Sequence, residues 1–331
     1  MKKLLIRILL LLLPIIICTS VIIFWDPFRI FFDYKDYYKD NVIEPNRSFV
    51  LTQTYLKYRK EYKFDSFIFG SSRSHAFRTN EWKKYLDDKA VPFHYDGASE
   101  TLYGINKKLM FLDKSGDSIK NVLFICDMST LTSTQNVIDH LHILPPALSG
   151  ESYLRFYFEF LKSSFSFEFI VANADYKINH KKKEYQKQLL SLEDYISYHD
   201  PVNGDYFYGN DKHISADSTG YYQEMINKGL FDRGTSENKK NPITNEEIIL
   251  LKEIAGIFQK HHTNFKIVIS PLYNQVPLDK EQLNLLNSIF DNKHVFDFSG
   301  KNSITDSIGN YYENSHYKPF IANSIMRLIY Q

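Results

Sequence analysis

Five short runs of mostly apolar residues recur along the chain, each ended by polar or turn-forming residues. They are Phe64–Phe69, Val91–Tyr95, Asn121–Cys126, Phe265–Ser270 and His294–Phe298. Continuous apolar runs of this length are typical of strands in a parallel sheet that is covered on both faces. The pattern therefore predicts five buried parallel strands.

Helical patterns, with apolar residues on one side of each helix, lie between and after these runs. They occupy residues 103–116, 244–262, 279–290 and 318–330. The second begins at a Thr244 or Asn245 cap and has acidic residues in its first turn. Strands alternating with helices imply βαβ units with right-handed crossovers, and hence a doubly wound sheet. We expect one parallel sheet with the strands in the spatial order 2-1-3-4-5.

The alternation breaks over residues 130–243. This stretch is rich in aromatic residues, then basic at Lys181–Lys183, then rich in turn-forming residues. We interpret it as a large insertion between the third and fourth strands, packed like a lid over one end of the sheet. Long connections of this kind often act as lids or specificity elements.

The N-terminus contains a long uncharged segment. Lys2, Lys3 and Arg7 precede residues 8–25, which carry no charge. That run is just long enough to span a hydrocarbon core, and no small-residue cleavage site follows it. The sequence thus predicts an uncleaved transmembrane signal anchor over 1–25, a juxtamembrane segment over 26–60 and one domain over 61–331. The distribution of basic residues places the N-terminus in the cytoplasm and the domain outside.

Composition narrows the range of partners. The net charge of +1 gives no electrostatic basis for binding nucleic acid. Cys18 and Cys126 lie in different predicted segments, so no disulfide is expected. His140 and His142 have the spacing of two ligands on one strand face, but no cysteine or acidic cluster completes a metal site. No P-loop or dinucleotide fingerprint occurs, so neither a metal nor a cofactor is expected.

Candidate catalytic residues follow the first strand and precede the last helix. The segment from Gly70 to Ser72 ends a strand, where ligands bind in open α/β sheets. A serine there is either a helix cap or a nucleophile, and a nucleophile needs a histidine base oriented by a carboxylate. Glu313 and His316 stand three residues apart, so a turn would bring both to one side. The alternative for His316 is a structural core histidine.

This arrangement resembles the SGNH (GDSL-like) hydrolase superfamily. Gly70 to Ser72 fits its first block, G-D-S, with Ser for Asp, and Glu313 to His316 fits its last block, D-x-x-H, with Glu for Asp. The resemblance implies a three-layer α/β/α, flavodoxin-like fold. It also implies that Ser72 is the nucleophile, that His316 is the base oriented by Glu313, and that the N–H groups of Ser72 and Gly97 form the oxyanion hole.

The third block of the family, G-x-N-D, is not matched. After the third strand the chain has Cys126 and Asp127, with no asparagine. We expect Asp127 to cap a helix or to bind the turn that carries Ser72. Arg73 is expected to form a salt bridge, with contact to an anionic substrate as the alternative.

The G-S-S-R and S-H-Y variants of the two blocks look most like membrane-anchored extracytoplasmic members of the superfamily. Those members are similar to alginate O-acetylation and teichoic-acid D-alanylation factors. The resemblance implies a single-pass protein of the bacterial cytoplasmic membrane whose domain faces the periplasm or exterior. It would be a serine esterase or O-acyltransferase that forms an acyl-serine on an acylated glycan or lipid-linked substrate of the cell envelope.

Two other interpretations stay open. The Glu for Asp exchange and the missing asparagine would suit a non-catalytic SGNH-like scaffold that binds a glycan or a membrane-bound acyltransferase. A plain binding domain without such a site is the third.

Overall fold

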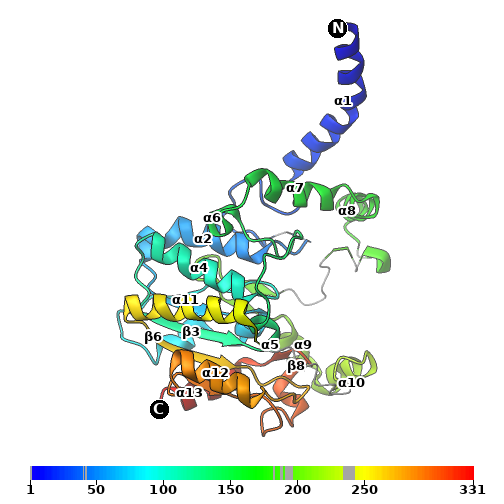
Figure 1. The fold of residues 1–331 in the computed structure, drawn as a ribbon. Helices are drawn as coiled ribbons and strands as arrows, with labels where there is room; N and C mark the ends of the chain where they lie inside the picture. Colours follow the sequence, from blue (N-terminus) through cyan, green and yellow to red (C-terminus); the bar gives the residue numbers. More distant parts are fainter. Residues whose placement is uncertain are drawn as a thin grey trace.

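A five-stranded parallel sheet forms the centre of the protein in a computed structural model of the chain (Figure 1). The structure describes residues 2–39, 41, 43–181, 183–186, 189–190, 197–233 and 243–331. The strands of the sheet are β1 (Ser66–Phe69), β2 (Pro92–His94), β3 (Asn121–Cys126), β6 (Asn264–Ile269) and β7 (Val295–Asp297). They pair in parallel in the order β2-β1-β3-β6-β7. The predicted strands, their parallel pairing and their order are confirmed.

Helices cover both faces of this sheet. Successive side chains of a strand point to opposite faces, so Phe67 and Phe69 belong to one core cluster and Ile68 to the other. The first cluster is covered by α2 (Arg47–Tyr62), α4 (Leu102–Lys114), α11 (Asn245–His261) and α12 (Lys280–Phe290). The second is covered by α3 (Thr79–Lys83) and α13 (Pro319–Ile329). Figure 1 shows α4 and α11 on the opposite side of β3 and β6 from α13.

The four predicted helices are confirmed as α4, α11, α12 and α13. In α11 the cap is Thr244, whose side chain and backbone form a capping box with Glu247. Such a box satisfies N–H groups that have no partner inside the helix, which explains why the helix begins there.

Helix α2 was not expected from the apolar pattern. It lies largely in the region that the sequence assigned to a juxtamembrane segment, yet Leu51 and Tyr55 are buried in the main core. Asn46 caps it by accepting a hydrogen bond from the N–H of Phe49. The α/β fold therefore includes part of the 26–60 segment, because this helix covers the same sheet face as α4.

The insertion between β3 and β6 packs against several parts of the molecule. Its elements are α5 (Met128–Leu131), α6 (Pro146–Ser149), α7 (Tyr153–Ser164), α8 (Phe167–Asn179), η2 (Glu184–Gln186), β4 (Tyr198–His199), β5 (Tyr206–Phe207), α9 (Asn210–Ala216) and α10 (Ser218–Asn227). The β4–β5 hairpin covers the edge of the sheet, where the N–H of His94 donates to Asn203 O over 2.8 Å. The Tyr221 hydroxyl of α10 donates to Tyr312 O, near the C-terminal hairpin.

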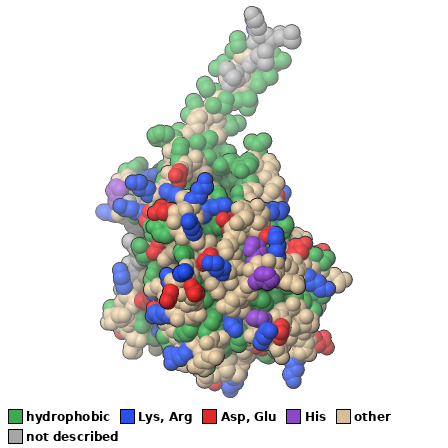
Figure 2. All heavy atoms as spheres, turned by 90° about the vertical axis from the view of Figure 1, so that its left-hand side faces the viewer, with side chains coloured by type: hydrophobic (Ala, Val, Ile, Leu, Met, Phe, Trp, Pro, Cys, Tyr) green, Lys and Arg blue, Asp and Glu red, His purple; other side chains and the backbone are tan. Residues whose placement is uncertain are grey.

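Helix α1 (Lys2–Trp25) projects away from the sheet, and its C-terminal end lies beside α7 (Figure 1). Many of its leucine and isoleucine side chains are exposed, and Figure 2 shows hydrophobic side chains along it. Within the described part of the chain, no helix has the length together with the apolar character that crossing a membrane requires.

Gly70 lies where the turn after β1 passes close to β3. A Cβ atom at this position would stand 2.7 Å from the carbonyl oxygen of Ile125 and 2.9 Å from Ser74 Cβ. We expect Gly70→Ala to lower the free energy of unfolding by about 1–3 kcal/mol, because overpacking forces backbone shifts. Chemical denaturation followed by circular dichroism measures this loss.

The control is Gly256→Ala in α11. Among the described residues, nothing lies within 4 Å of a Cβ built there. Alanine favours a helix interior over glycine by about 0.5–1 kcal/mol, so this variant should be as stable as the parent or more so. Equal losses in both variants would contradict the packing argument.

Candidate active site

Ser72 opens the short 3₁₀-helix η1 (Ser72–Ala76) just after β1, at the carboxyl edge of the sheet. The N–H of Ser74 donates to Ser71 O over 2.8 Å and is the first bond of this turn. The N–H of Ser72 precedes that bond and therefore has no acceptor within the helical ladder.

His316 and Glu313 come from a hairpin formed by β8 (Tyr311–Glu313) and β9 (His316–Tyr317). Glu313 pairs with His316 across this hairpin, so the turn brings their side chains together. His316 Nδ1 is hydrogen-bonded to Glu313 Oε1. His316 Nε2 lies 2.7 Å from Ser72 Oγ. The structure thus brings all three predicted catalytic residues into one hydrogen-bonded chain.

The Glu313 carboxylate is suited to orient the imidazole. Burial alone would raise its pKa, but the hydrogen bond and charge of His316, with the N–H of Ser315, hold the pKa below its ordinary value. An ionised carboxylate at Nδ1 keeps the proton on that nitrogen. Nε2 is then the acceptor that faces the Ser72 hydroxyl.

Gly97 does not take the expected role. It follows β2, as predicted, but its N–H donates to Gly70 O over 3.1 Å. A donor that is already bonded to a carbonyl inside the turn is not directed at the space beside Ser72. The structure therefore corrects the expected oxyanion hole, in which the Gly97 N–H was to be the second donor.

Asp127 has both of the expected contacts. It caps α5 by accepting hydrogen bonds from the N–H groups of Ser129 and Thr130. Its other oxygen accepts a hydrogen bond from Arg73 Nη1 over 2.6 Å, which ties it to the turn that carries Ser72. Arg73 thus forms the predicted salt bridge, and its guanidinium compensates the charge of Asp127.

A cavity of about 290 Å³ begins at this ion pair. It lies beyond the carboxyl ends of β3 and β6. Its walls combine apolar side chains with the polar ones of Arg73, Asp127, Asn274 and three serines. The apolar ones are Met128, Ile269, Leu272, Val276, Pro277 and Leu278. Its volume is roughly twice that of the ~150 Å³ engineered cavity that holds a benzene molecule in another protein.

Tyr208, from the insertion, was missed by the sequence analysis. Its hydroxyl lies 3.3 Å from Ser72 O and 3.1 Å from His75 Nδ1, and its ring centroid is 5.5 Å from that of His316. Burial raises the pKa of Tyr208 well above its ordinary value, so the hydroxyl keeps its proton. No periodicity in the insertion indicates that this tyrosine reaches the site.

His75 links Tyr208 to a buried carboxylate. Its Nε2 lies 2.7 Å from Asp96 Oδ2. Burial lowers the pKa of His75 to about 3, against the opposing effect of Asp96. The neutral imidazole therefore carries its proton on Nε2, towards the carboxylate, and accepts at Nδ1. Asp96 lies two residues after the end of β2, so the rule that ligands bind at the carboxyl ends of strands could have singled it out.

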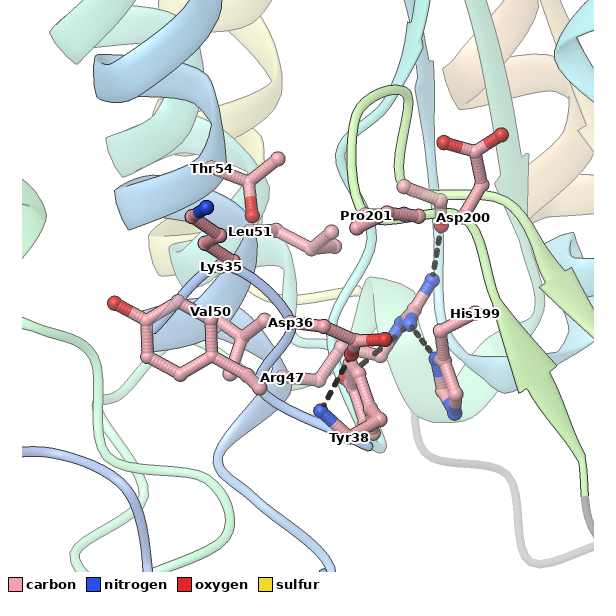
Figure 3. Close-up of a pocket in the computed structure, with 12 residues that line it drawn as sticks. Lys35, Asp36, Tyr38, Arg47, Val50, Leu51, Thr54, His199, Asp200 and Pro201 are labelled. Carbon is pink, nitrogen blue, oxygen red and sulfur yellow. Dashed lines mark hydrogen bonds between the residues drawn. The ribbon is translucent and has the colours of Figure 1, made fainter. Parts of the chain in front are cut away.

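Asp96 in turn pairs with Arg47 of α2. Arg47 Nε lies 2.6 Å from Asp96 Oδ2, and Nη2 lies 2.7 Å from Oδ1. Figure 3 shows the Arg47 guanidinium directed towards His199, with Tyr38 beside it. The cavity around these side chains measures about 10 Å³, no more than a single water molecule needs. This region is therefore structural support and not a ligand site.

We expect Arg47→Met to lower the free energy of unfolding by about 3–5 kcal/mol, because it leaves the buried Asp96 carboxylate without its main partner. Urea denaturation measures the change. Lys84→Met is the matched control, since the Lys84–Glu81 pair is exposed and such pairs contribute about 0–1 kcal/mol. A loss no larger for Arg47→Met than for the control would show that the buried pair does not hold α2 in place.

No model of a known protein family matches the chain, and the search of curated proteins finds no match either. What the protein does must therefore be inferred from the site itself.

Proposed function

We propose that the protein is a serine esterase or O-acyltransferase of the SGNH type that works through an acyl-serine. The observation that carries this proposal is the 2.7 Å contact between Ser72 Oγ and His316 Nε2, with Glu313 on the other nitrogen. Serine alone is a weak nucleophile, and this constellation is the one that activates it.

The reaction has two halves. Ser72 Oγ attacks the carbonyl carbon of an ester and gives its proton to His316 Nε2. The tetrahedral intermediate then collapses, the C–O bond to the leaving alcohol breaks, and His316 returns the proton to that alcohol. Water or a sugar hydroxyl next attacks the acyl-serine by the same route in reverse, which releases Ser72. Hydrolase and transferase differ only in this last acceptor.

The N–H of Ser72 is the proposed oxyanion donor. Asp127 stands in the place of the usual asparagine, and an isolated carboxylate near a developing oxyanion would oppose catalysis. The ion pair with Arg73 offsets that charge, with Nη1 2.6 Å from the carboxylate. This favours an active site over an inactive one. We propose the cavity beyond Arg73 as the place where the acyl part of the substrate is held.

The proposed location is the outer face of a bacterial cytoplasmic membrane, to whose lipid α1 attaches the domain. The exposed leucine and isoleucine side chains of α1 support attachment to lipid. The resemblance described above supports an acylated glycan or lipid-linked substrate of the cell envelope. It also supports a membrane-bound acyltransferase as a partner.

One observation favours the second candidate, a non-catalytic scaffold for a glycan or a membrane-bound acyltransferase. Since the Gly97 N–H is bonded to Gly70 O, the oxyanion hole lacks the second donor that the resemblance implies. Loss of one such donor typically costs about 10²–10³ in kcat. A scaffold would retain the geometry of the three residues without needing a full oxyanion hole.

The first test is covalent labelling with a fluorophosphonate, followed by intact-protein mass and peptide mapping. We expect one adduct on Ser72, because His316 activates only that hydroxyl. Ser72→Ala should remove the adduct, and the matched variant Ser71→Ala should keep it, because the side chain of that neighbouring serine makes no capping hydrogen bond. An adduct that persists in Ser72→Ala would assign the wrong serine, and no adduct on the parent protein with several probes would favour the scaffold.

The second test concerns Glu313. We expect Glu313→Gln to lower kcat on an activated ester such as p-nitrophenyl acetate by about 10³–10⁴, because the amide no longer fixes the imidazole tautomer. Thermal unfolding of the same variant controls for folding. Glu313→Asp restores the charge with a shorter reach and should recover part of the rate. Full activity in Glu313→Gln would remove Glu313 from the mechanism.

A further inference from the structure

We propose that one face of helices α7 and α8 rests on the lipid surface beside α1, so that the domain is held against the membrane. This proposal rests on the attachment of α1 to the membrane proposed above. It concerns different residues, and it assigns a role to a part of the insertion that does not contact the candidate active site.

Helix α7 has two apolar sides. One side packs into the core through Phe156 and Phe160. On another side, Leu154 is 83% exposed and Phe158 is 61% exposed. These two stand at helical spacing with Phe165, which follows the helix and is also exposed. A helix of a soluble protein normally presents polar residues on the face opposite the core.

Helix α8 repeats this arrangement. Phe169 and Ala172 are buried, whereas Phe167 is 75% exposed, and Val171 and Ile178 are exposed as well. The exposed residues are spaced by four and seven positions, which places them on one side of the helix. Soluble monomers rarely expose contiguous apolar surface of this kind without a partner.

Helices α7 and α8 themselves lie next to the end of α1, which their buried sides contact. The ring of Phe28, just after α1, packs against those of Phe160 and Phe169 at 5.6 and 5.4 Å between centroids. Lys177 Nζ of α8 lies 4.4 Å from the ring centroid of Trp25, the last residue of α1. Figure 1 shows α7 and α8 at the base of α1, on the side of the domain from which α1 projects.

A lipid surface fits this arrangement better than a protein partner. α1 exposes apolar side chains on most of its sides, including Phe24 at 87%. A helix that is apolar all round belongs either in the core of a large protein or in a membrane, and α1 projects away from the core (Figure 1). The exposed residues of α7 and α8 continue that surface at its base. Tryptophan beside lysine, as in the contact of Trp25 with Lys177, is typical of membrane interfaces, where in-plane helices bury aromatic and aliphatic side chains.

The experiment uses the full chain in liposomes, with single cysteines labelled by an environment-sensitive nitrobenzoxadiazole dye. Cys18→Ser removes the exposed native cysteine, and Cys126 is buried. Labels replace Phe158 and Phe167 on the proposed face and Phe24 on α1. Phe320 of α13 is the matched control, since it is also an exposed phenylalanine but belongs to a helix at the other end of the molecule (Figure 1).

We expect quenchers on lipid acyl chains to reduce the emission of labels 158 and 167 by roughly twofold or more, because interfacial helices bury their apolar face about 5–10 Å deep. Aqueous iodide should quench label 320 alone. Quenching of label 24 by lipid, with labels 158 and 167 open to iodide, would overturn this inference and leave the anchoring of α1 intact. If label 24 is also open to iodide, the anchoring itself fails.

A protein partner predicts a different pattern. Labels 158 and 167 would then be shielded from iodide in native membranes but not in liposomes of purified lipid, and this result would overturn the lipid assignment. A second copy of the chain would give shielding that depends on the ratio of protein to lipid. The double variant Leu154→Gln, Phe158→Gln adds a check, because it should weaken lipid quenching of label 167 while thermal stability stays nearly unchanged.

Discussion

The buried ion pair between Arg47 and Asp96 connects four parts of the chain. Arg47 belongs to α2, Asp96 follows β2, and Arg47 Nη2 also donates to Gly204 O in the β4–β5 hairpin over 2.8 Å. The fourth part is the serine turn, through His75. Burying two charges is costly, and the cost is recovered only where every polar atom finds a partner. The geometry of one guanidinium therefore constrains the positions of α2, the hairpin and the turn together.

The ion pair also affects the surroundings of Ser72, because it determines the protonation states of Asp96 and His75. Burial alone would raise the pKa of Asp96, but the Arg47 guanidinium and His75 hold it well below its usual range. A permanent carboxylate fixes the proton of His75 on Nε2. The single proton of the Tyr208 hydroxyl then has two acceptors within reach, His75 Nδ1 at 3.1 Å and Ser72 O at 3.3 Å. Tyr208 contacts the serine through its backbone, and its ring lies beside that of His316. We therefore assign these side chains a positioning role and no step in the proposed chemistry.

The sequence was sufficient to predict the features that depend on short-range pattern and on general rules of topology, namely the strands and their order. Apolar runs indicated the strands, and right-handed crossovers determined an order that brings Ser72 and His316 to one edge. The sequence was insufficient where the role of a residue depends on one hydrogen bond. The Gly97 N–H is unavailable to a substrate because it donates to Gly70 O, and the sequence does not show how closely those two atoms approach. Tyr208 lies in an insertion whose path depends on side-chain contacts, such as those of Arg47, and not on periodicity.

The serine turn also shows why residue types in hydrogen-bond contact do not by themselves define an active site. Ser74, two residues after Ser72, lies 2.9 Å from His94 Nε2, and His94 Nδ1 lies 3.3 Å from Asp205. This is a second serine–histidine–carboxylate series, but its members are fully buried or nearly so, and the Ser74 hydroxyl lies 2.8 Å from Ser71 O, to which it donates. No ester could reach that oxygen without unfolding the turn. Ser72, His316 and Glu313 are each partly exposed, and access to solvent is therefore what separates the candidate nucleophile from a serine that holds the turn in shape.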